Sequence, residues 1–224
     1  MNKMDEVVYA VPKDKLFEDG LFEFQGLLAR SDDHFLFQAI MENIFKHHIE
    51  MTRGDCENDP GYKHIIPYVV IKTHRGKYLL TTRTENQTER RLHNKKSIGV
   101  GGHIGPVTDK AMPKDMSFAE MVDLGMRREL LEELQASQND DAPAVRPLLD
   151  ILKPKHVGII NDDSNSVGSV HLGLVYFATI RQQDMQRIGI KETENMTSSW
   201  CDFSEMKAME GLESWSQIII NSGS

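Results

Sequence analysis

One stretch constrains this chain more than any other, the segment from 117 to 136, Ser-Phe-Ala-Glu-Met-Val-Asp-Leu-Gly-Met-Arg-Arg-Glu-Leu-Leu-Glu-Glu-Leu-Gln-Ala. Ser117 with Glu120 three residues later has the form of a capping box, which satisfies free N–H groups at the start of a helix. No proline follows before Pro143, and Leu, Met, Glu and Arg dominate. The stretch therefore predicts a helix of about five turns.

Three carboxylates share one face of this predicted helix. At about 100° per residue, Glu129, Glu132 and Glu133 fall within an arc of about 100°. Like charges at this spacing repel one another by a few tenths of a kcal/mol, and a cation would reverse that cost. Oxygen ligands favour Mg²⁺, Ca²⁺ or Mn²⁺. Arg128, one turn before Glu132, can hold that carboxylate by a charge-assisted hydrogen bond. A solvated acidic face on a surface helix is the alternative.

The spacing of these charges resembles a known motif. Glu120, seven residues, and then Arg128-Glu129-Leu130-x-Glu132-Glu133 resemble the core of the Nudix box, Gly-x5-Glu-x7-Arg-Glu-U-x-Glu-Glu-x-Gly-U, where U is aliphatic. The two glycine positions differ, since Lys114 and Gln135 occupy them. The run Gly101-Gly102 lies further upstream, which implies a loop insertion before the helix.

The resemblance implies a fold and an activity. The fold is α+β, a three-layer α/β/α sandwich with a mixed β-sheet, over residues 63–224. Residues 1–62 form an N-terminal extension that packs on the core or makes a homodimer contact. The activity is hydrolysis of a pyrophosphate (phosphoanhydride) bond in a nucleoside diphosphate derivative, with Mg²⁺ or Mn²⁺ as cofactor. The expected partner is a phosphorylated small molecule or nucleotide.

The resemblance also implies roles for individual residues. A bound metal lowers the pKa of an attacking water, and a glutamate takes the proton of that water. The expected metal ligands are Glu129, Glu132, Glu133 and the backbone carbonyl of Gly101. The expected catalytic residues are Arg128 as the orienting group, with Glu133 or Glu194 as the base. Glu192 is the weaker candidate in the same loop before Trp200.

Substrate contacts are expected from basic and glycine-rich residues before the helix. Arg83, at the end of a predicted strand over 77–83, is the first choice for a bidentate phosphate contact, with a solvated loop as the alternative. Gly102 permits close approach of a ligand. His103 follows it, and His171 lies on an apolar predicted strand. Each histidine is a candidate substrate contact, with a hydrogen-bonded structural histidine as the alternative.

Two other functions fit parts of the pattern. A Nudix-fold binding or regulatory module without catalysis typically loses part of the Arg-Glu-U-x-Glu-Glu cluster, which is intact here. An isopentenyl diphosphate isomerase-like enzyme draws support from Gly-Gly-His at 101–103. Its catalytic cysteine would be expected near that run, whereas Cys56 and Cys201 lie elsewhere.

Composition excludes some classes of protein. The formal net charge of −8 argues against a general nucleic-acid or membrane-surface binder. Two cysteines without CxxC spacing indicate neither a disulfide framework nor a zinc site, and they fit a reducing cytoplasm. No apolar run approaches the length of a membrane span.

Apolar periodicity predicts the remaining elements. These are strands at 7–11 and 21–28, a helix at 34–51, a hairpin of strands 65–73 and 77–83, strands at 156–160 and 169–178, and a helix at 202–220. The polar residues 53–62, with Gly54, Pro60 and Gly61, are the best boundary in the chain.

Overall fold

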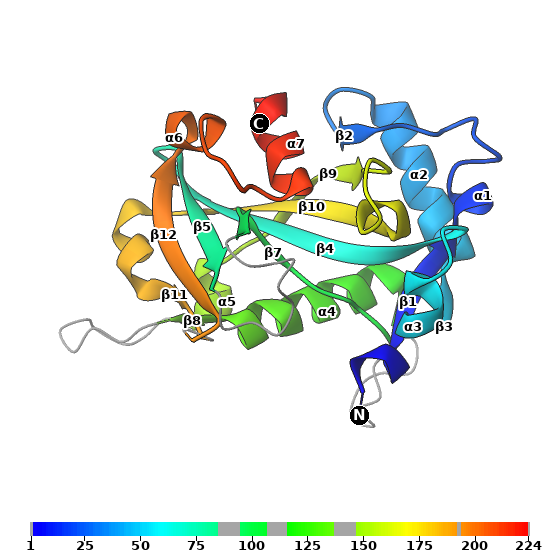
Figure 1. Ribbon diagram of the computed structural model, residues 1–224, viewed down its shortest axis with the longest axis horizontal. Helices are drawn as coiled ribbons and strands as arrows, with labels where there is room; N and C mark the ends of the chain where they lie inside the picture. The colour runs from blue at the N-terminus through cyan, green and yellow to red at the C-terminus, as the bar shows by residue number, and fades with distance from the viewer. Residues whose placement is uncertain (1, 85–94, 107–115, 137–146, 192–193, 224) are drawn as a thin grey trace. The chain divides into compact units, whose positions relative to one another are not determined.

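The structure is a computed structural model that describes residues 2–84, 95–106, 116–136, 147–191 and 194–223 (Figure 1). The chain divides into two compact units, and each is described by itself. Unit 1 comprises Met1–Tyr68, Gly101–Met126 and Val157–Val175. Unit 2 comprises Val69–Val100, Arg127–His156 and Tyr176–Ser224. The predicted boundary at residue 62 stays a prediction, although residues 1–62 belong to the same unit as 101–126 and 157–175.

Unit 1 is organised by the N-terminal strand. Strand β1 (Val7–Pro12) pairs antiparallel with β3 (Ile49–Thr52) from Val7↔Thr52 to Ala10↔Ile49. It also pairs antiparallel with the start of β4 (Tyr62–Thr73), with Ala10 opposite His64. Strand β2 (Gly26–Ala29) pairs antiparallel with β9 (Lys155–Asn161). The remaining elements that lie wholly in this unit are η1 (Lys3–Asp5), α1 (Lys13–Leu16), α2 (His34–His47), α3 (Arg53–Glu57) and η3 (Gly168–Val170).

Helix α2 ends earlier than the sequence pattern predicts. Asp33 caps its start by accepting a hydrogen bond from the Leu36 N–H at 2.9 Å. The prediction of a helix to residue 51 is wrong, because the backbone turns extended at His48 and residues 49–52 form β3. Antiparallel pairing with β1 satisfies the backbone groups of this short segment, so tertiary pairing overrides the helical apolar spacing.

Unit 2 is built on a long antiparallel strand pair. Strand β12 (Met196–Asp202) pairs with β5 (Lys77–Arg83) from Met196↔Arg83 to Asp202↔Lys77. The predicted hairpin between β4 and β5 is present, with Lys72 opposite Tyr78 and Gly76 at a φ of 78° in the turn. Further elements are β6 (Lys96–Ser97), α5 (Leu148–Ile151), η4 (Gln182–Arg187), α6 (Phe203–Lys207) and α7 (Ser214–Ser222). Strand β7 (Gly99–Gly101) begins in unit 2, and its last residue belongs to unit 1.

The predicted single helix at 202–220 is two helices. Glu205 accepts a hydrogen bond from the Asp202 N–H at 2.7 Å at the start of α6. The chain then leaves the helical path at Gly211, whose φ of 81° is left-handed, before α7 begins at Ser214. A glycine at positive φ breaks the helix that the apolar spacing alone suggests.

Helix α4 (Phe118–Glu133) confirms the central prediction of the sequence analysis. The capping box is present: the Glu120 N–H donates to Ser117 Oγ at 3.3 Å, and the Ser117 N–H donates to the Glu120 carboxylate at 2.7 Å. One side of the helix is apolar and buried, and it consists of Phe118, Val122, Met126, Leu130 and Leu134.

The helix leads directly into a strand, three residues before its predicted end. Strand β8 (Leu134–Ala136) follows Glu133 at once and pairs antiparallel with β11 (Ile188–Ile190). Gln135, which occupies the second glycine position of the box, lies in β8, and its side chain donates to the Ile190 carbonyl at 3.2 Å. Strand pairing therefore takes the place of a glycine turn at the helix exit.

The main sheet has the strand order β12-β5-β4-β10-β9-β2, where β10 is His171–Ile180. In the described part of the chain, no helix combines the length and the apolar character that a membrane span requires.

Candidate active site

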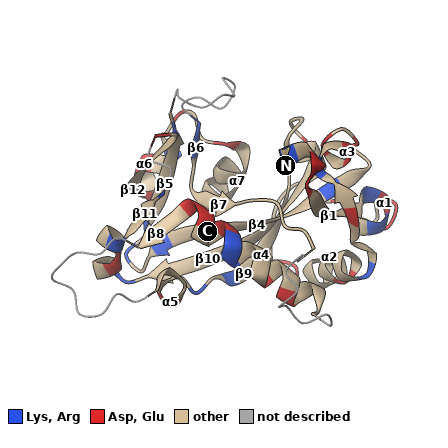
Figure 2. Ribbon diagram, turned by 90° about the horizontal axis from the view of Figure 1, so that it is seen from below, with Lys and Arg blue, Asp and Glu red and all other residues tan. Residues whose placement is uncertain are grey.

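The acidic face of α4 is organised by Arg128. Its Nη2 lies 2.7 Å from Glu129 Oε1, and its Nε lies 3.5 Å from Glu132 Oε1. The predicted Arg128–Glu132 pair is therefore present, and the shorter contact to Glu129 is one that the spacing alone did not single out. The Glu129 side chain is 14% exposed and that of Glu132 is 58% exposed. One guanidinium thus contacts one nearly buried and one exposed carboxylate. Figure 2 shows acidic and basic residues side by side on this helix.

The C-terminal end of α4 is tied to the segment that follows β11. The Lys191 N–H donates to the Glu133 carbonyl at 2.8 Å, and Lys191 Nζ donates to the Leu131 carbonyl. Carbonyls of a last helical turn lack partners within the helix, so these bonds satisfy groups that would otherwise need water. The loop that bears Glu194 consequently starts beside Glu133.

The backbone around Glu194 is held at the end of β5. Thr84 Oγ1 donates to the Glu194 carbonyl at 2.8 Å, and the Thr84 N–H donates to the Asn195 carbonyl at 2.8 Å. Glu194 is exposed and lies three residues after Lys191, a span of about 10 Å at most. Glu192 lies outside the described residues.

Arg83 has a partner that the sequence analysis missed. Its Nε lies 3.7 Å from Glu213 Oε1, just before α7. Burial raises the pKa of Glu213 above its ordinary value, and the charge of Arg83 with a hydrogen bond from Ser97 limits the rise. Arg83 pairs with Met196 across β5 and β12, so it stands at the sheet end where the Glu194 loop is anchored. Nothing in the local sequence distinguishes Glu213 from the exposed glutamates of the chain.

Two glycines of unit 1, Gly101 and Gly105, pack so closely against β4 and β1 that a side chain would not fit. A Cβ on Gly101 would lie 2.2 Å from the Pro67 carbonyl oxygen, and one on Gly105 would lie 2.1 Å from that of Val7. The Tyr9 N–H also donates to the Ile104 carbonyl at 2.7 Å. These glycines therefore have a packing role, which does not depend on the predicted metal contact of the Gly101 carbonyl. Gly102 follows β7 and is half-buried.

The two predicted histidines lie together and have a third neighbour. The Nε2 atoms of His103 and His171 are 3.3 Å apart. The ring of His64, which the sequence analysis did not consider, has its centroid 4.7 Å from the centroid of each of the other two rings. These residues are far apart in sequence, and no local pattern links them.

All three imidazoles have pKa values below the ordinary value of histidine. Burial is the main cause for each, and the positive charge of Arg53 adds to it. The pKa is lowered to about 3 for His64 and to about 2 for His103. The rings are therefore neutral near pH 7.

Comparisons with known proteins agree with this fold. No protein-family model matches the chain. Protein YmaB of Bacillus subtilis (strain 168) is 38% identical over 224 residues, which cover 99% of this chain and 98% of that protein. The crystal structure of Tm1382, a candidate Nudix hydrolase, matches with a TM-score of 0.69 at 24% identity over 97% of each chain. A MutT protein from Methanosarcina mazei Go1 covers 71% of this chain and 91% of its own, with a TM-score of 0.44 and 20% identity.

The chain belongs to the family of Protein YmaB, and its fold is the one seen in Tm1382. The predicted α+β Nudix fold, with helices and a mixed sheet, is confirmed. Both likenesses extend over nearly the whole chain, so they include residues 1–62 as well as the segment that resembles the Nudix box.

Proposed function

We propose that this protein is a hydrolase that cleaves a phosphoanhydride bond in a nucleoside diphosphate derivative with the help of Mg²⁺ or Mn²⁺. The observation that carries the proposal is the acidic face of α4, where Arg128 holds Glu129 and Glu132 beside Glu133 in a Nudix fold. A binding module that had lost catalysis would not need this set of carboxylates.

The donor set fits a hard divalent cation. Glu129, Glu132 and Glu133 offer carboxylate oxygens from successive turns of one helix, and such ligands suit Mg²⁺ and Mn²⁺. The Gly101 carbonyl is a further ligand that the resemblance implies. A bound metal would neutralise phosphate charge and lower the pKa of an attacking water.

Residues of the chain itself would then position the reacting groups. Arg128 fixes the orientation of Glu129 and Glu132, as partners outside the ligand shell do for metal-binding side chains. Glu133 or Glu194 takes the proton of the attacking water. The Lys191 contact to the Glu133 carbonyl supports the second choice, because it starts the Glu194 loop at this end of the helix.

Arg83 is the proposed phosphate contact. A guanidinium can donate two parallel hydrogen bonds to a phosphate, and its contact with Glu213 fixes its direction beforehand. His103, His171 and Gly102 also remain proposed substrate contacts. The cytoplasmic location and the homodimer stay predictions.

The test is a substrate screen with the purified chain. Nucleoside triphosphates, sugar nucleotides, dinucleoside polyphosphates and capped RNA are incubated with Mg²⁺ or Mn²⁺, and the phosphorylated products are separated and quantified. Glu133→Gln serves as the inactive control for each compound. We expect metal-dependent release of a nucleoside phosphate from at least one class by the wild type alone. Nucleotide binding without release from any class would favour the catalytically inactive module.

A further inference from the structure

Three histidines of unit 1 meet from three separate segments. His64 lies in β4, His103 follows β7, and His171 is the first residue of β10. Their coordinating nitrogens all lie within 4.8 Å of one another. This cluster shares no residue with the acidic face of α4 and offers nitrogen where that face offers oxygen.

The tautomer of His171 is fixed by its surroundings. Its Nδ1 lies 2.6 Å from the Val167 carbonyl oxygen, which can only accept a hydrogen bond. Nδ1 therefore carries the proton in the neutral ring, and Nε2 presents a lone pair toward His103. Metal-binding histidines are typically oriented in this way, with the far N–H donated to a backbone carbonyl.

The environment of His64 is that of a metal ligand. The residue is fully buried, and within the described residues neither of its ring nitrogens has a hydrogen-bond partner. Such groups are rare in native proteins, and an ion or a water is the usual explanation. A hydrogen bond from His103 Nε2 to His171 Nε2 would satisfy one nitrogen of each of those two rings. The ring nitrogens of His64 would still lack a partner among the described residues.

We propose that His64, His103 and His171 form a second metal site that takes a transition metal ion, with Zn²⁺ as the ion to test. Bonds of about 2.0–2.1 Å in a tetrahedron place ligand nitrogens about 3.3 Å apart. The His103–His171 separation of 3.3 Å already has this value. Imidazole ligands suit Zn²⁺ and Co²⁺ rather than Mg²⁺, and three of them leave one tetrahedral position for water or another ligand.

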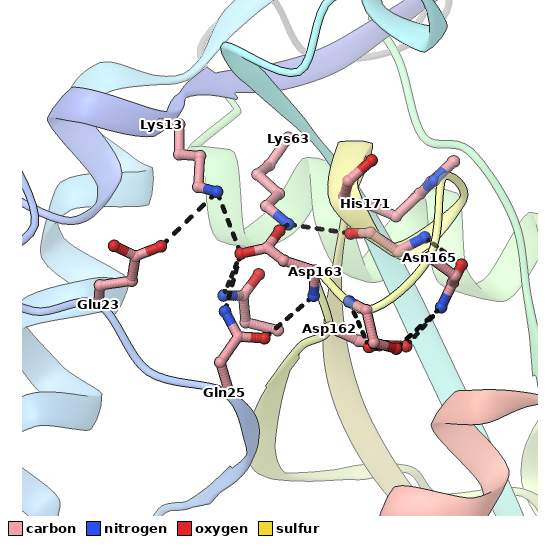
Figure 3. A network of polar contacts seen from close by, with 12 residues as sticks. Lys13, Glu23, Gln25, Lys63, Asp162, Asp163, Asn165 and His171 are labelled. Carbon is pink, nitrogen blue, oxygen red and sulfur yellow. Dashed lines mark hydrogen bonds and ion pairs between the residues drawn. The ribbon is translucent and has the colours of Figure 1, made fainter.

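A polar network beside His171 holds the loop that orients this ligand (Figure 3). The fully buried Lys63, next to His64, donates from Nζ to Asp163 Oδ1 at 2.7 Å and to the Gly168 carbonyl at 2.9 Å. Asn165 Oδ1 accepts from the N–H groups of Val167 and Gly168 at 3.1 and 2.9 Å. This loop thereby fixes the Val167 carbonyl that orients His171.

The nearby charges are compatible with a bound cation. Arg53 is the positive charge that acts on all three rings. Its Nε lies 2.7 Å from Glu57 Oε1, and its Nη1 lies 3.8 Å from Glu6 Oε2, so two carboxylates offset it. Asp163 likewise offsets Lys63.

The test is a Co²⁺ titration of the full chain after treatment with a chelator. It is carried out in the Glu132→Gln, Glu133→Gln background, so that the acidic face of α4 does not compete and failure of the proposed hydrolase does not affect the result. We expect one equivalent of Co²⁺ with the visible absorption of a tetrahedral, nitrogen-rich site, displaced by Zn²⁺. Zn²⁺ should also raise the melting temperature, because it binds the folded state.

Substitutions then assign the ligands. His64→Gln and His103→Gln should each weaken Co²⁺ binding by more than the roughly 100-fold that loss of an outer partner can cost. His34→Gln, an exposed histidine at the start of α2 in the same unit, should leave binding unchanged. Far-UV circular dichroism of the metal-free variants checks that they fold.

Two results would overturn the proposal. The first is failure of the parent protein to bind Co²⁺ with a nitrogen-ligand spectrum, which needs no variant. The second is binding that survives in a folded His64→Gln or His103→Gln variant within about tenfold of the parent, a difference of only about 1.4 kcal/mol.

Discussion

At the scale of single residues, Arg128 explains how one helix carries several carboxylates on the same face. It contacts Glu129 at 2.7 Å and Glu132 at 3.5 Å, so its charge reduces the repulsion between them. The side chain of Arg128 is 46% exposed, and exposed ion pairs contribute little to stability. We therefore expect Arg128 to orient the proposed metal ligands rather than to stabilise the fold.

Replacement of Arg128 by lysine tests this role. An ammonium group cannot reach two carboxylates with a planar fork, so we expect Arg128→Lys to weaken Mn²⁺ binding by about 10- to 100-fold. The melting temperature without metal should hardly change. Isothermal titration with Mn²⁺ measures the effect, with the neighbouring Arg127→Lys as the control. Equal affinity in both variants would show that Arg128 does not orient the ligands.

Glu194 is the second prediction at this scale. It is exposed, so Glu194→Gln should leave the melting temperature unchanged while it lowers turnover. If Glu194 is the base, the pH–rate profile of the variant should lose its acidic limb. The limb should remain in Glu192→Gln. An acidic limb that persists in both variants would assign the base to Glu133.

At the scale of elements, close backbone approach holds the segment that bears His103. Gly101 and Gly105 leave no space for a Cβ against β4 and β1. Helix α4 contributes a further contact of this kind, since a Cβ on Gly125 would lie 2.3 Å from Ile104 Cγ2. Glycine inside a helix is normally a weakness, so packing explains its presence here.

Gly125→Ala should therefore destabilise the protein although alanine is the better helix former. The gain in helix propensity is about 1 kcal/mol, whereas overpacking of a well-filled core costs about 1–3 kcal/mol. We expect a lower midpoint in chemical denaturation, partly restored by Ile104→Ala in the same chain. Gly189→Ala, where no atom lies within 4 Å of the added Cβ, is the control. Stabilisation by Gly125→Ala would contradict the packing argument.

The Lys63–Asp163 pair makes a prediction about pH. Burial alone would raise the pKa of Asp163, but hydrogen bonds from Lys63, Gln25 and Lys13 outweigh it and lower the pKa from 3.8 to about 2. A carboxyl group with a depressed pKa in the folded state stabilises that state above its unfolded pKa. This contribution is lost as the pH falls from about 3.8 through about 2.

Asp163→Asn should cost about 3–5 kcal/mol at neutral pH, because it removes the carboxylate that is hydrogen-bonded to the buried Lys63 ammonium. The difference from the wild type should shrink as the pH approaches 2. Lys63→Met should be the milder change, since it leaves the carboxylate with Lys13 and Gln25. Urea denaturation at a series of pH values measures all three proteins. If the difference in unfolding free energy between the wild type and Asp163→Asn did not change with pH, ionisation of Asp163 would not be coupled to folding.

At the scale of the whole molecule, local patterns were predictable from the sequence, whereas contacts between residues far apart in the chain were not. The capping box, the acidic face of α4 and the Arg128–Glu132 pair follow from spacings of three to four residues, which the helical period fixes. The His64, His103 and His171 cluster and the Arg83–Glu213 contact join residues far apart in the chain, and only tertiary structure brings them together. The helices predicted at 34–51 and 202–220 were wrong in extent because strand pairing and a left-handed glycine override apolar spacing.

The measurement that tests the account most directly is turnover of Glu132→Gln and Glu133→Gln on the best substrate of the screen, at saturating Mg²⁺ or Mn²⁺. Loss of a metal ligand removes several kcal/mol of transition-state stabilisation, so each variant should be slower by about three orders of magnitude. Melting curves without metal should match the wild type, because Glu132 is largely exposed and neither residue belongs to the buried core. Activity within about tenfold of the wild type in both variants would contradict the assignment of the α4 face as the catalytic metal site.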